Sequence, residues 1–473
     1  MPTFSIENFG CRATDADAAA LRRSLAATGL ACLDDHTHAD FVVLNSCTVT
    51  ASADAQAREA VRKIHRLNPG AQIVVTGCYA QRAPEEIAAL DGVAWVVGNS
   101  HQAQIPGLIQ DALSVAGSAK LVGRDFVPLT QIDDEAMSLA RGPAKILSGD
   151  IFAQTSVQVA PEGGIKGSRT RPILKIQDGC SNRCSYCVIP FVRGRSRSLA
   201  PEVVLEEVRK LVAAGAKEIV LSGINLGSYG RDFSPRVPLV DVVRRILDET
   251  SLEHLRFSSV EPQDVTEDFI ALVASSDRLA RHFHIPLQSG TQKILKAMHR
   301  WYRPALYADR IWQIRRALPA AAIGADVIVG FPGESDEDFR ETYEFIDSLP
   351  LAYLHVFSFS ARPGTEAAGL DSGASVAAGV IRDRARTLRQ LSREKATDFR
   401  ASQVGRKMRA ITLDRGGPDW TEALTSHYLK VRVAGRHPAN LWVDVEVAAE
   451  ASVEPTPETS VAGEEAAALT LRR

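Results

Sequence analysis

The sequence QDGCSNRCSYC, residues 177–187, places Cys180, Cys184 and Cys187 in the spacing CxxxCxxC. Thiolates this close together bind one metal centre more readily than they form disulfides, and iron–sulfur clusters are held by such ligands. No cysteine follows and the next histidine is His254, so a fourth local ligand is missing. Structural zinc, which takes four protein ligands, is therefore the weaker interpretation. The pattern favours a four-iron cluster with one iron left open.

Residues 170–402 alternate between predicted strands and helices, beginning with a strand at 173–176 that leads into the cysteine motif. Further strands are predicted at 218–221, 255–258, 282–287, 325–329 and 354–359. Helices separate them, such as 201–214, where apolar residues recur on one face. Six such units fall short of the eight strands of a closed barrel. We therefore predict an α/β partial barrel, open on one side, that admits a large substrate.

Four residues follow the ends of successive strands of this predicted barrel. Gly223 follows the second strand, Ser259 and Glu261 follow the third, and Gln288 follows the fourth. Active sites of βα barrels are built at this end of the strands. Each residue alone is equally well explained by a tight turn. Their common placement favours cofactor binding.

The N-terminal residues 1–117 are predicted to form an open α/β domain with a parallel sheet. Cys11, Cys47 and Cys78 each come just after the C-terminal end of a predicted strand. Those ends share one edge of a parallel sheet, and ligands bind there. We therefore expect the three cysteines to converge. Cys32 falls outside this pattern and is interpreted as a small buried apolar residue.

Three other regions differ in composition from these two domains. Residues 118–169 contain many glycine and proline breakers and are predicted to be a linker with one or two short elements. Residues 403–450 alternate with period two between glycine turns, which predicts a small antiparallel β-barrel. The tail, 451–473, is rich in Ala, Glu and Thr and is predicted to be disordered. The basic helix expected at 376–400 suits a solvated face and an RNA-facing one equally.

The net charge of −2 gives no indication of nucleic acid binding, so any RNA contact depends on local basic patches. Arg193, Arg195 and Arg197 lie just past the cysteine motif and suit phosphate binding, with carboxylate pairing within the barrel as the alternative. The first residues do not resemble a signal peptide. No apolar run approaches the roughly 20 residues of a membrane-spanning helix. Seven cysteines, an odd number, argue against a secreted disulfide framework, so we expect a cytoplasmic protein without a membrane partner.

The cysteine motif, with Tyr186 just before its last cysteine, resembles the signature of the radical S-adenosylmethionine (SAM) superfamily. The resemblance implies that Cys180, Cys184 and Cys187 hold a four-iron cluster whose open iron binds SAM. An electron from the cluster then cleaves SAM to a radical. By the same resemblance, Tyr186 and the four strand-end residues are candidates for contacts with SAM.

The order of Cys11, Cys47 and Cys78, the radical SAM motif and a terminal β-domain resembles the radical SAM methylthiotransferase family over nearly the whole chain. The resemblance implies a second four-iron cluster at the three N-terminal cysteines and a TRAM-like domain at 403–450. It implies that one SAM supplies a methyl group to sulfur and that another supplies the radical. It also implies tRNA as a partner and an electron donor such as flavodoxin or ferredoxin.

Three stretches, NSCTVT at 45–50, TGCYAQ at 76–81 and KIQDGC at 175–180, most resemble one subgroup of this family. That subgroup modifies N6-threonylcarbamoyladenosine next to the tRNA anticodon, so we expect methylthio transfer to C2 of this nucleoside. The alternatives are isopentenyladenosine in tRNA, an aspartate of a ribosomal protein, and a non-catalytic iron–sulfur sensor that binds RNA. Thr14 and Asp17 stand where the family usually has Asn and Glu, which concerns the surroundings of the second cluster.

Overall fold

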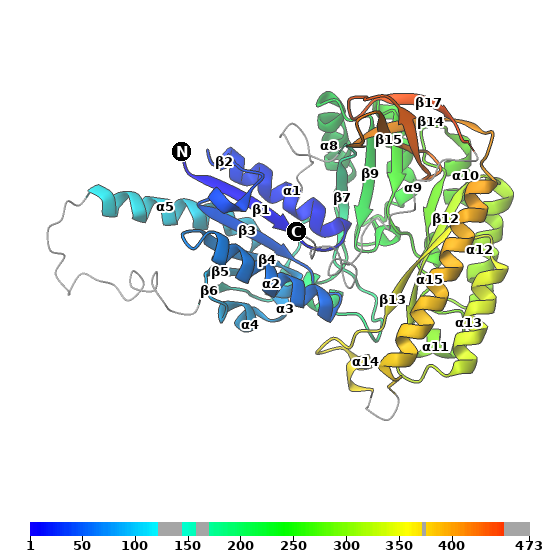
Figure 1. Ribbon diagram of the computed structural model, residues 1–473, viewed down its shortest axis with the longest axis horizontal. Helices are drawn as coiled ribbons and strands as arrows, with labels where there is room; N and C mark the ends of the chain where they lie inside the picture. Colours follow the sequence, from blue (N-terminus) through cyan, green and yellow to red (C-terminus); the bar gives the residue numbers. More distant parts are fainter. Residues whose placement is uncertain (122–143, 158–169, 371–374, 449–473) are drawn as a thin grey trace. The chain divides into compact units, whose positions relative to one another are not determined.

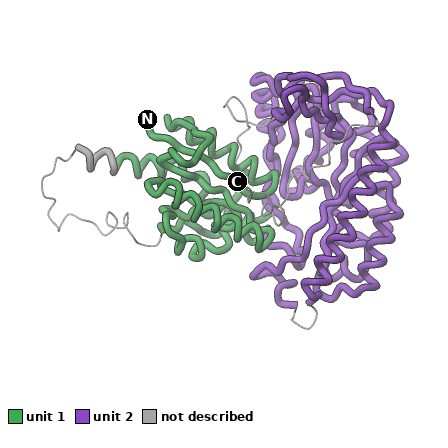
Figure 2. The backbone as a smooth tube through the Cα atoms, viewed as in Figure 1, with its two compact units in different colours: residues 1–160, 189–195, 459–473 green, residues 161–188, 196–458 purple. Residues whose placement is uncertain are grey.

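The computed structural model describes residues 1–121, 144–157, 170–370 and 375–448. The chain forms two compact units, which Figure 2 draws in different colours. Unit 1 contains Met1–Ala160 and the short segment Ile189–Arg195, and unit 2 contains Pro161–Val188 and Ser196–Glu458. The predicted disordered tail and most of the predicted linker lie outside the described residues.

Unit 1 is built on a parallel β-sheet. Its strands, in spatial order, are β2 (Ala31–Cys32), β1 (Thr3–Asn8), β3 (Phe41–Ser46), β4 (Gln72–Gly77), β5 (Val93–Gly98) and β6 (Lys145–Leu147). Each neighbouring pair is parallel, as the sequence predicted for this domain. Strand β6 comes from the stretch in which we predicted a linker with one or two short elements. It extends the sheet of unit 1 beyond residue 117.

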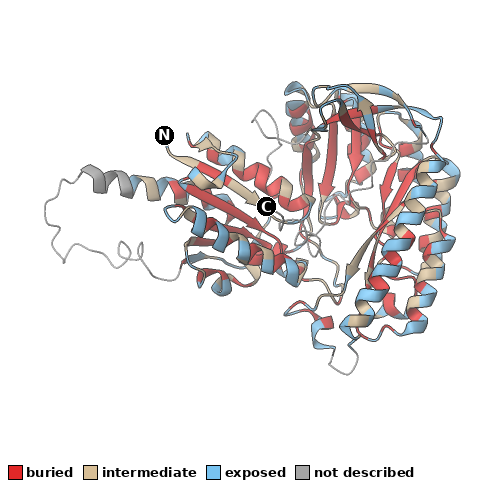
Figure 3. Cartoon of the chain, viewed as in Figure 1, coloured by how far each residue is buried: buried red, intermediate tan, exposed pale blue. Residues whose placement is uncertain are grey.

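Helices cover both faces of this sheet, and the central strand β3 is buried at every residue (Figures 1 and 3). Val42 packs on the face covered by α2 (Ala51–Leu67), and Val43 packs on the face covered by α1 (Arg12–Ala27) and α5 (Ile105–Leu121). A parallel strand that is covered on both faces has a continuous run of apolar residues in its sequence. The run FVVL at residues 41–44 could therefore be predicted as a strand. The shorter elements are α3 (Cys78–Arg82), α4 (Pro84–Ala88), α7 (Ile189–Arg193), η1 (His36–His38), η2 (Gln102–Gln104) and η4 (Ile151–Ala153).

Unit 2 contains the predicted partial barrel. Its six parallel strands are β7 (Ile173–Asp178), β9 (Glu218–Gly223), β10 (His254–Phe257), β11 (His282–His284), β12 (Ala322–Val329) and β13 (Tyr353–Ser358). A parallel bridge between Ser259 and His284 joins the β10 and β11 halves of the wall. The short strand β8 (Arg197–Ser198) pairs antiparallel with β7 at one edge. The partial barrel predicted from six βα units is confirmed.

Helices cover the outside of the barrel and expose their outer faces (Figure 3). They are α8 (Pro201–Ala213), α9 (Leu239–Glu249), α10 (Glu267–Ser275), α11 (Gln292–Ala297), α12 (Pro304–Ala317), α13 (Asp336–Ser348), α14 (Glu366–Gly369) and α15 (Ala378–Ala401), with turns η5 (Leu226–Ser228) and η6 (Pro262–Asp264). The basic helix α15 packs on β13 through Leu388 and Leu391. Its Arg384 is buried and pairs with Glu334 at 2.6 Å, so this arginine belongs to the core of unit 2.

The C-terminal region of unit 2 forms a four-stranded antiparallel sheet in the order β16-β15-β14-β17. The strands are β14 (Lys407–Gly416), β15 (Trp420–Thr425), β16 (Lys430–Ala434) and β17 (Trp442–Glu446). The antiparallel C-terminal domain predicted from the period-two pattern is confirmed. Its β15–β16 turn packs on the barrel, because Ser426 Oγ lies 3.2 Å from His254 Nε2 and Tyr428 stacks on His282 at 4.0 Å between ring centroids. Within the described residues, no helix is both long enough and apolar enough to cross a bilayer.

Candidate iron–sulfur and cofactor site

The cysteine loop of unit 2 follows directly from β7, and the side chain of Gln177 holds its first residues. The Gln177 amide nitrogen donates to the Gly179 carbonyl at 2.8 Å, and its oxygen accepts from the Asn225 backbone N–H at 2.7 Å. Gly223 makes room for this side chain, since a Cβ there would lie 2.8 Å from the Gln177 oxygen. The absence of a side chain at Gly223 therefore serves the anchoring of the loop.

The other end of the loop is anchored to α11. Ser185 Oγ donates to the Ala297 carbonyl at 2.7 Å, and the Ser185 backbone N–H donates to the Met298 carbonyl at 3.1 Å. Between these anchors the chain turns sharply, with the Cys187 N–H bonded to the Cys184 carbonyl at 3.0 Å. None of the three cysteines of the loop is in a disulfide, and each residue is partly exposed. The loop is thus held on both sides of its cysteines.

Burial and charge act in opposite directions on these thiols. Burial raises the pKa of Cys180 to about 11 and also raises the pKa of Cys184. Arg300 opposes this at Cys184, where its guanidinium Nη1 donates to Sγ at 3.6 Å. Arg300 also pairs with Glu261, and burial raises the pKa of that carboxyl. A cluster needs thiolates as ligands, so a cation beside the sulfur favours metal binding.

The strand-end residues chosen from the sequence lie at the same end of the barrel as the cysteine loop. Gln288 adopts a φ of 65° and bonds through its backbone to both Asp326 and Ile328. Ser259 lies two residues past the end of β10 and forms the bridge to His284 of β11. Tyr186 is half-buried and packs against the apolar cluster that contains Met298. The structure therefore groups these residues around the loop, and their contacts with SAM stay a prediction.

Unit 1 brings its three cysteines together at the ends of three adjacent strands. Cys11 precedes α1, Cys47 follows β3, and Cys78 opens α3 after β4. Gly10 has a φ of 133°, and a Cβ there would lie 2.6 Å from the Cys47 Cβ, so only glycine allows this approach. Burial raises the pKa of Cys47, and the charges of Cys11 and Cys78 raise it further because the three thiols are neighbours.

Arg193 is buried beside Cys78 in unit 1. Its Nε donates to Cys78 Sγ at 3.3 Å, and its Nη2 donates to Asp17 Oδ2 at 2.7 Å. The side chains of Arg193 and Asp17 are each only 2% exposed. Asn99 adds a second N–H donor to the same sulfur at 3.6 Å. This burial speaks against the predicted contact of Arg193 with RNA phosphate. Arg193 pairs with a carboxylate instead, but the partner is Asp17 of unit 1 and not a residue of the barrel.

The other two arginines of the predicted basic patch have different surroundings. Arg197 is mostly buried and pairs with Asp178 Oδ2 at 3.5 Å. Arg195 is exposed. Of the three arginines predicted to bind phosphate, Arg195 is therefore the exposed one.

Both cysteine trios suit a four-iron cluster. Each consists of three cysteines without disulfides, and one sulfur in each trio accepts an N–H from a buried arginine. Such donors offset the negative charge of thiolates and tune the potential of iron–sulfur clusters. Cys32 lies apart in β2, half-buried, where burial raises its pKa. The interpretation of Cys32 as a packing residue agrees with this position.

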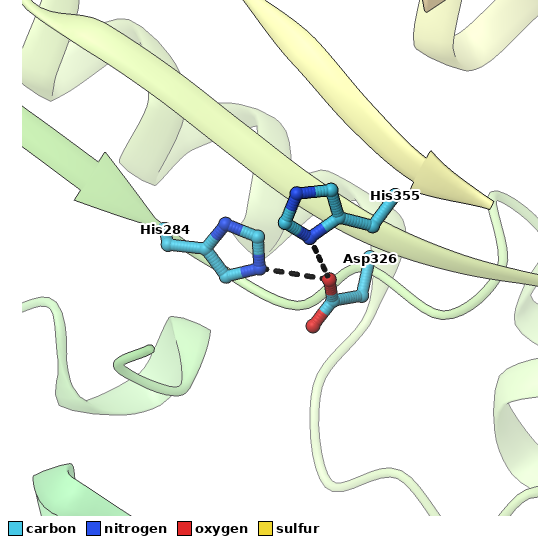
Figure 4. A group of neighbouring side chains, drawn as sticks. All are labelled: His284, Asp326 and His355. Atoms are coloured by element: carbon cyan, nitrogen blue, oxygen red, sulfur yellow. Dashed lines mark hydrogen bonds and ion pairs between the residues drawn. The ribbon is translucent and has the colours of Figure 1, made fainter. Parts of the chain in front are cut away.

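Several residues near the sites were not chosen from the sequence. Arg300 and Asn99 follow no motif, and only the fold brings them to a sulfur. A further group, His284, Asp326 and His355, comes from three adjacent barrel strands (Figure 4). Its ligand atoms lie within 4.8 Å of one another. The alternation of side chains along β11, β12 and β13 was the available signal for this group.

Comparison with known proteins supports both halves of this description. Residues 3–98 match the model of the uncharacterized protein family UPF0004, and residues 174–346 match the radical SAM superfamily. A threonylcarbamoyladenosine tRNA methylthiotransferase MtaB of Aquifex aeolicus is 32% identical over 91% of this chain and 96% of its own length. Its counterpart in Bacillus subtilis is 34% identical over 92% and 91%.

The chain is also similar to a second kind of relative. The tRNA-2-methylthio-N(6)-dimethylallyladenosine synthase of Syntrophobacter fumaroxidans is 34% identical over 77% of this chain and 75% of its own length. Among solved structures, the radical SAM methyltransferase TsrM of Kitasatospora setae superposes with a TM-score of 0.53 at 16% identity, covering 78% of this chain and 77% of that one. This likeness concerns the fold alone.

Proposed function

Because the chain belongs to the radical SAM methylthiotransferase family, we propose that it transfers a methylthio group to C2 of N6-threonylcarbamoyladenosine next to the tRNA anticodon. The observation that carries the proposal is the match to relatives of that name over about nine-tenths of both chains. The dimethylallyladenosine synthase of Syntrophobacter fumaroxidans matches a smaller share, 77% of this chain. The enzyme is a radical SAM methylthiotransferase, so the non-catalytic alternative is not favoured.

As a radical SAM enzyme, the protein uses SAM and a four-iron cluster. We assign this cluster to Cys180, Cys184 and Cys187, and SAM contacts to Tyr186 and the strand-end residues Gly223, Ser259, Glu261 and Gln288. When bound, the cluster supplies the electron that cleaves SAM. The protein's own part is to hold the loop through Gln177 and Ser185 and to place Arg300 beside a ligand sulfur.

We assign a second four-iron cluster to Cys11, Cys47 and Cys78. The assignment is supported by the position of three free cysteines at adjacent strand ends, where the charges of Cys11 and Cys78 raise the pKa of Cys47. Arg193 and Asn99 direct N–H groups at Cys78, which favours a thiolate there. In this assignment unit 1 would hold the sulfur-donating centre.

We further propose tRNA as the partner of the enzyme, a reductant such as flavodoxin or ferredoxin, and a cytoplasmic location. The domains we assign are 1–117 for the methylthiotransferase domain, 170–402 for the radical SAM domain and 403–450 for a TRAM-like domain. Arg195 and the exposed arginines of α15 are the candidates for contact with the RNA backbone.

Mass spectrometry of tRNA nucleosides from a deletion strain tests the proposed substrate. We expect the methylthio form of threonylcarbamoyladenosine to disappear and to return on complementation with the wild-type gene. A Cys184→Ala gene should fail to complement and serves as the matched control. Loss of the methylthio form of the isopentenyl nucleoside instead would assign the enzyme to the sibling reaction. An unchanged nucleoside profile would point to the ribosomal-protein alternative.

A further inference from the structure

The group formed by His284, Asp326 and His355 has no role in holding the cysteine loop, yet its three possible ligand atoms lie within 4.8 Å of one another on the barrel wall. His284 comes from β11, Asp326 from β12 and His355 from β13 (Figure 4). Asp326 Oδ1 lies 2.8 Å from His284 Nε2 and 3.2 Å from His355 Nδ1. One carboxylate oxygen therefore holds both rings.

The two histidines differ in how many of their ring nitrogens are hydrogen-bonded. The second ring nitrogen of His284, Nδ1, lies 3.1 Å from the Tyr353 hydroxyl, so both of its nitrogens are engaged. His355 Nε2 has no hydrogen-bond partner among the described residues, and neither has Asp326 Oδ2. Figure 4 shows this carboxylate oxygen turned away from both rings. The side chains of Asp326 and His355 keep 20% and 26% of their exposure, so a ligand can reach them.

These two atoms also have a definite chemistry. His355 directs its Nδ1 at the carboxylate, so in the neutral ring the proton lies on Nδ1 and Nε2 is an acceptor. Asp326 Oδ2 is an acceptor too, since the charge of His284 and the hydrogen bonds from both histidines lower the pKa of this carboxyl against the effect of its burial. The wall therefore presents two neighbouring acceptors that call for N–H or O–H donors.

The position of the group links it to the reacting centre of unit 2. The Asp326 carbonyl accepts from the backbone N–H of Gln288 at 2.8 Å, and Gln288 is one of the residues assigned to SAM. The charge of Asp326 also contributes to the raised pKa of Glu261, whose main cause is burial, so these two carboxyls are near each other. Glu261 pairs with Arg300, which contacts Cys184.

We propose that His355 Nε2 and Asp326 Oδ2 bind the polar arm of the substrate nucleoside, with His284 as a positioning residue that orients Asp326. The inference rests on the proposed function. A threonylcarbamoyl arm carries N–H and O–H donors that match the two acceptors. A dimethylallyl arm is a hydrocarbon and would leave both acceptors without a partner. Sites built to hydrogen-bond a substrate discriminate strongly against analogues that lack the donor.

The test compares two anticodon stem-loop RNAs that differ only in this arm, threonylcarbamoyl or dimethylallyl. Dissociation constants for both RNAs are measured with the reconstituted full-length enzyme, and kcat/KM is measured on the threonylcarbamoyl RNA. His355→Phe should weaken binding of the threonylcarbamoyl RNA by about tenfold or more and leave that of the other RNA within about twofold. His355→Gln keeps a polar atom near the Nε2 position and should lose less. His38→Phe, an exposed histidine of unit 1, is the matched control and should match the wild type.

The readout is the ratio of the two affinities, because damage to the barrel would lower both together. An equal loss for both RNAs, or no loss with His355→Phe, overturns the inference while the proposed function stands. A wild-type enzyme that leaves threonylcarbamoyladenosine unmodified overturns both. Two histidines and a carboxylate also form a common set of ligands for divalent metals. A stoichiometric divalent ion other than iron that is lost in Asp326→Asn and in His355→Gln would therefore overturn the inference as well.

Discussion

Replacing Asp17 by Asn should destabilise unit 1, because it leaves the Arg193 guanidinium buried without its counter-charge. Both side chains are 2% exposed and their contact is 2.7 Å long. Breaking a buried pair by removing one partner costs about 3–5 kcal/mol. Asn keeps an oxygen that can accept from Nη2, so we expect the lower end, about 3 kcal/mol.

Hydrogen-exchange mass spectrometry on peptides from α1 (Arg12–Ala27) measures this in the reconstituted enzyme. A loss of about 3 kcal/mol corresponds to amide exchange faster by about a hundredfold where exchange requires opening of the unit. Asp15→Asn is the matched control on the same helix. Asp15 is only partly buried and accepts a hydrogen bond from Asn8 at 2.7 Å, so about 1 kcal/mol or less is expected.

Arg193→Met and the double variant complete a mutant cycle. Removing Arg193 leaves Asp17 buried alone, whereas removing both charges restores neutrality, so the double variant should be more stable than the sum of the single losses predicts. A coupling of at least about 1.5 kcal/mol is expected. Additive losses, or α1 exchange within about threefold of wild type in Asp17→Asn, would refute the account of Arg193 as a buried, charge-balanced donor to Cys78.

Three further changes test other parts of the structure. Cys78→Ala should reduce the iron content after anaerobic reconstitution from about eight to about four per chain while SAM cleavage continues, and an iron content that stays near eight would remove the second cluster from this site. Arg300→Gln should lower the reduction potential of the radical SAM cluster, because a cation and an N–H donor are lost from Cys184. The potential is measured by electron paramagnetic resonance during a redox titration, and an unchanged value would contradict this expectation. Burial lowers the pKa of His427 to about 4, so the stability that the neutral ring contributes is present above about pH 6.5 and is lost as the pH falls toward 4. In His427→Phe, the free energy of unfolding measured with urea should therefore change less over this pH range, by about 2–3 kcal/mol. An equally steep pH dependence in the variant would argue against a buried neutral His427.

Much of the fold could be predicted because its strands are short, apolar and bounded by turn residues. Because the C-terminal ends of parallel strands lie at one edge of a sheet, the sequence alone predicted that Cys11, Cys47 and Cys78 converge. The short strand β6 follows a long stretch of breakers, and its three residues carry too little pattern to indicate a sixth sheet partner. Its pairing with β5 depends on tertiary packing.

The polar surroundings of the sulfurs were harder to predict than the sulfurs themselves. Arg193 was predicted to contact phosphate because Arg195 and Arg197 nearby are also basic. Its partner Asp17 is 176 residues away in the sequence, and no local sequence pattern predicts this pair. Asp17 was noticed only as a departure from the usual Glu of the family. The structure gives that position a physical role, since the carboxylate holds the donor to Cys78.

The membership of Ile189–Arg195 in unit 1 limits how this enzyme can be dissected. A recombinant fragment that stops near residue 160 would omit Arg193 and keep Asp17, so this buried carboxylate would lose its ion pair with Arg193. Expression of residues 1–160 alone is therefore a poor route to an isolated N-terminal metal centre. Supplying Ile189–Arg195, the segment that contains α7, in trans as a synthetic peptide would be the way to rescue such a fragment.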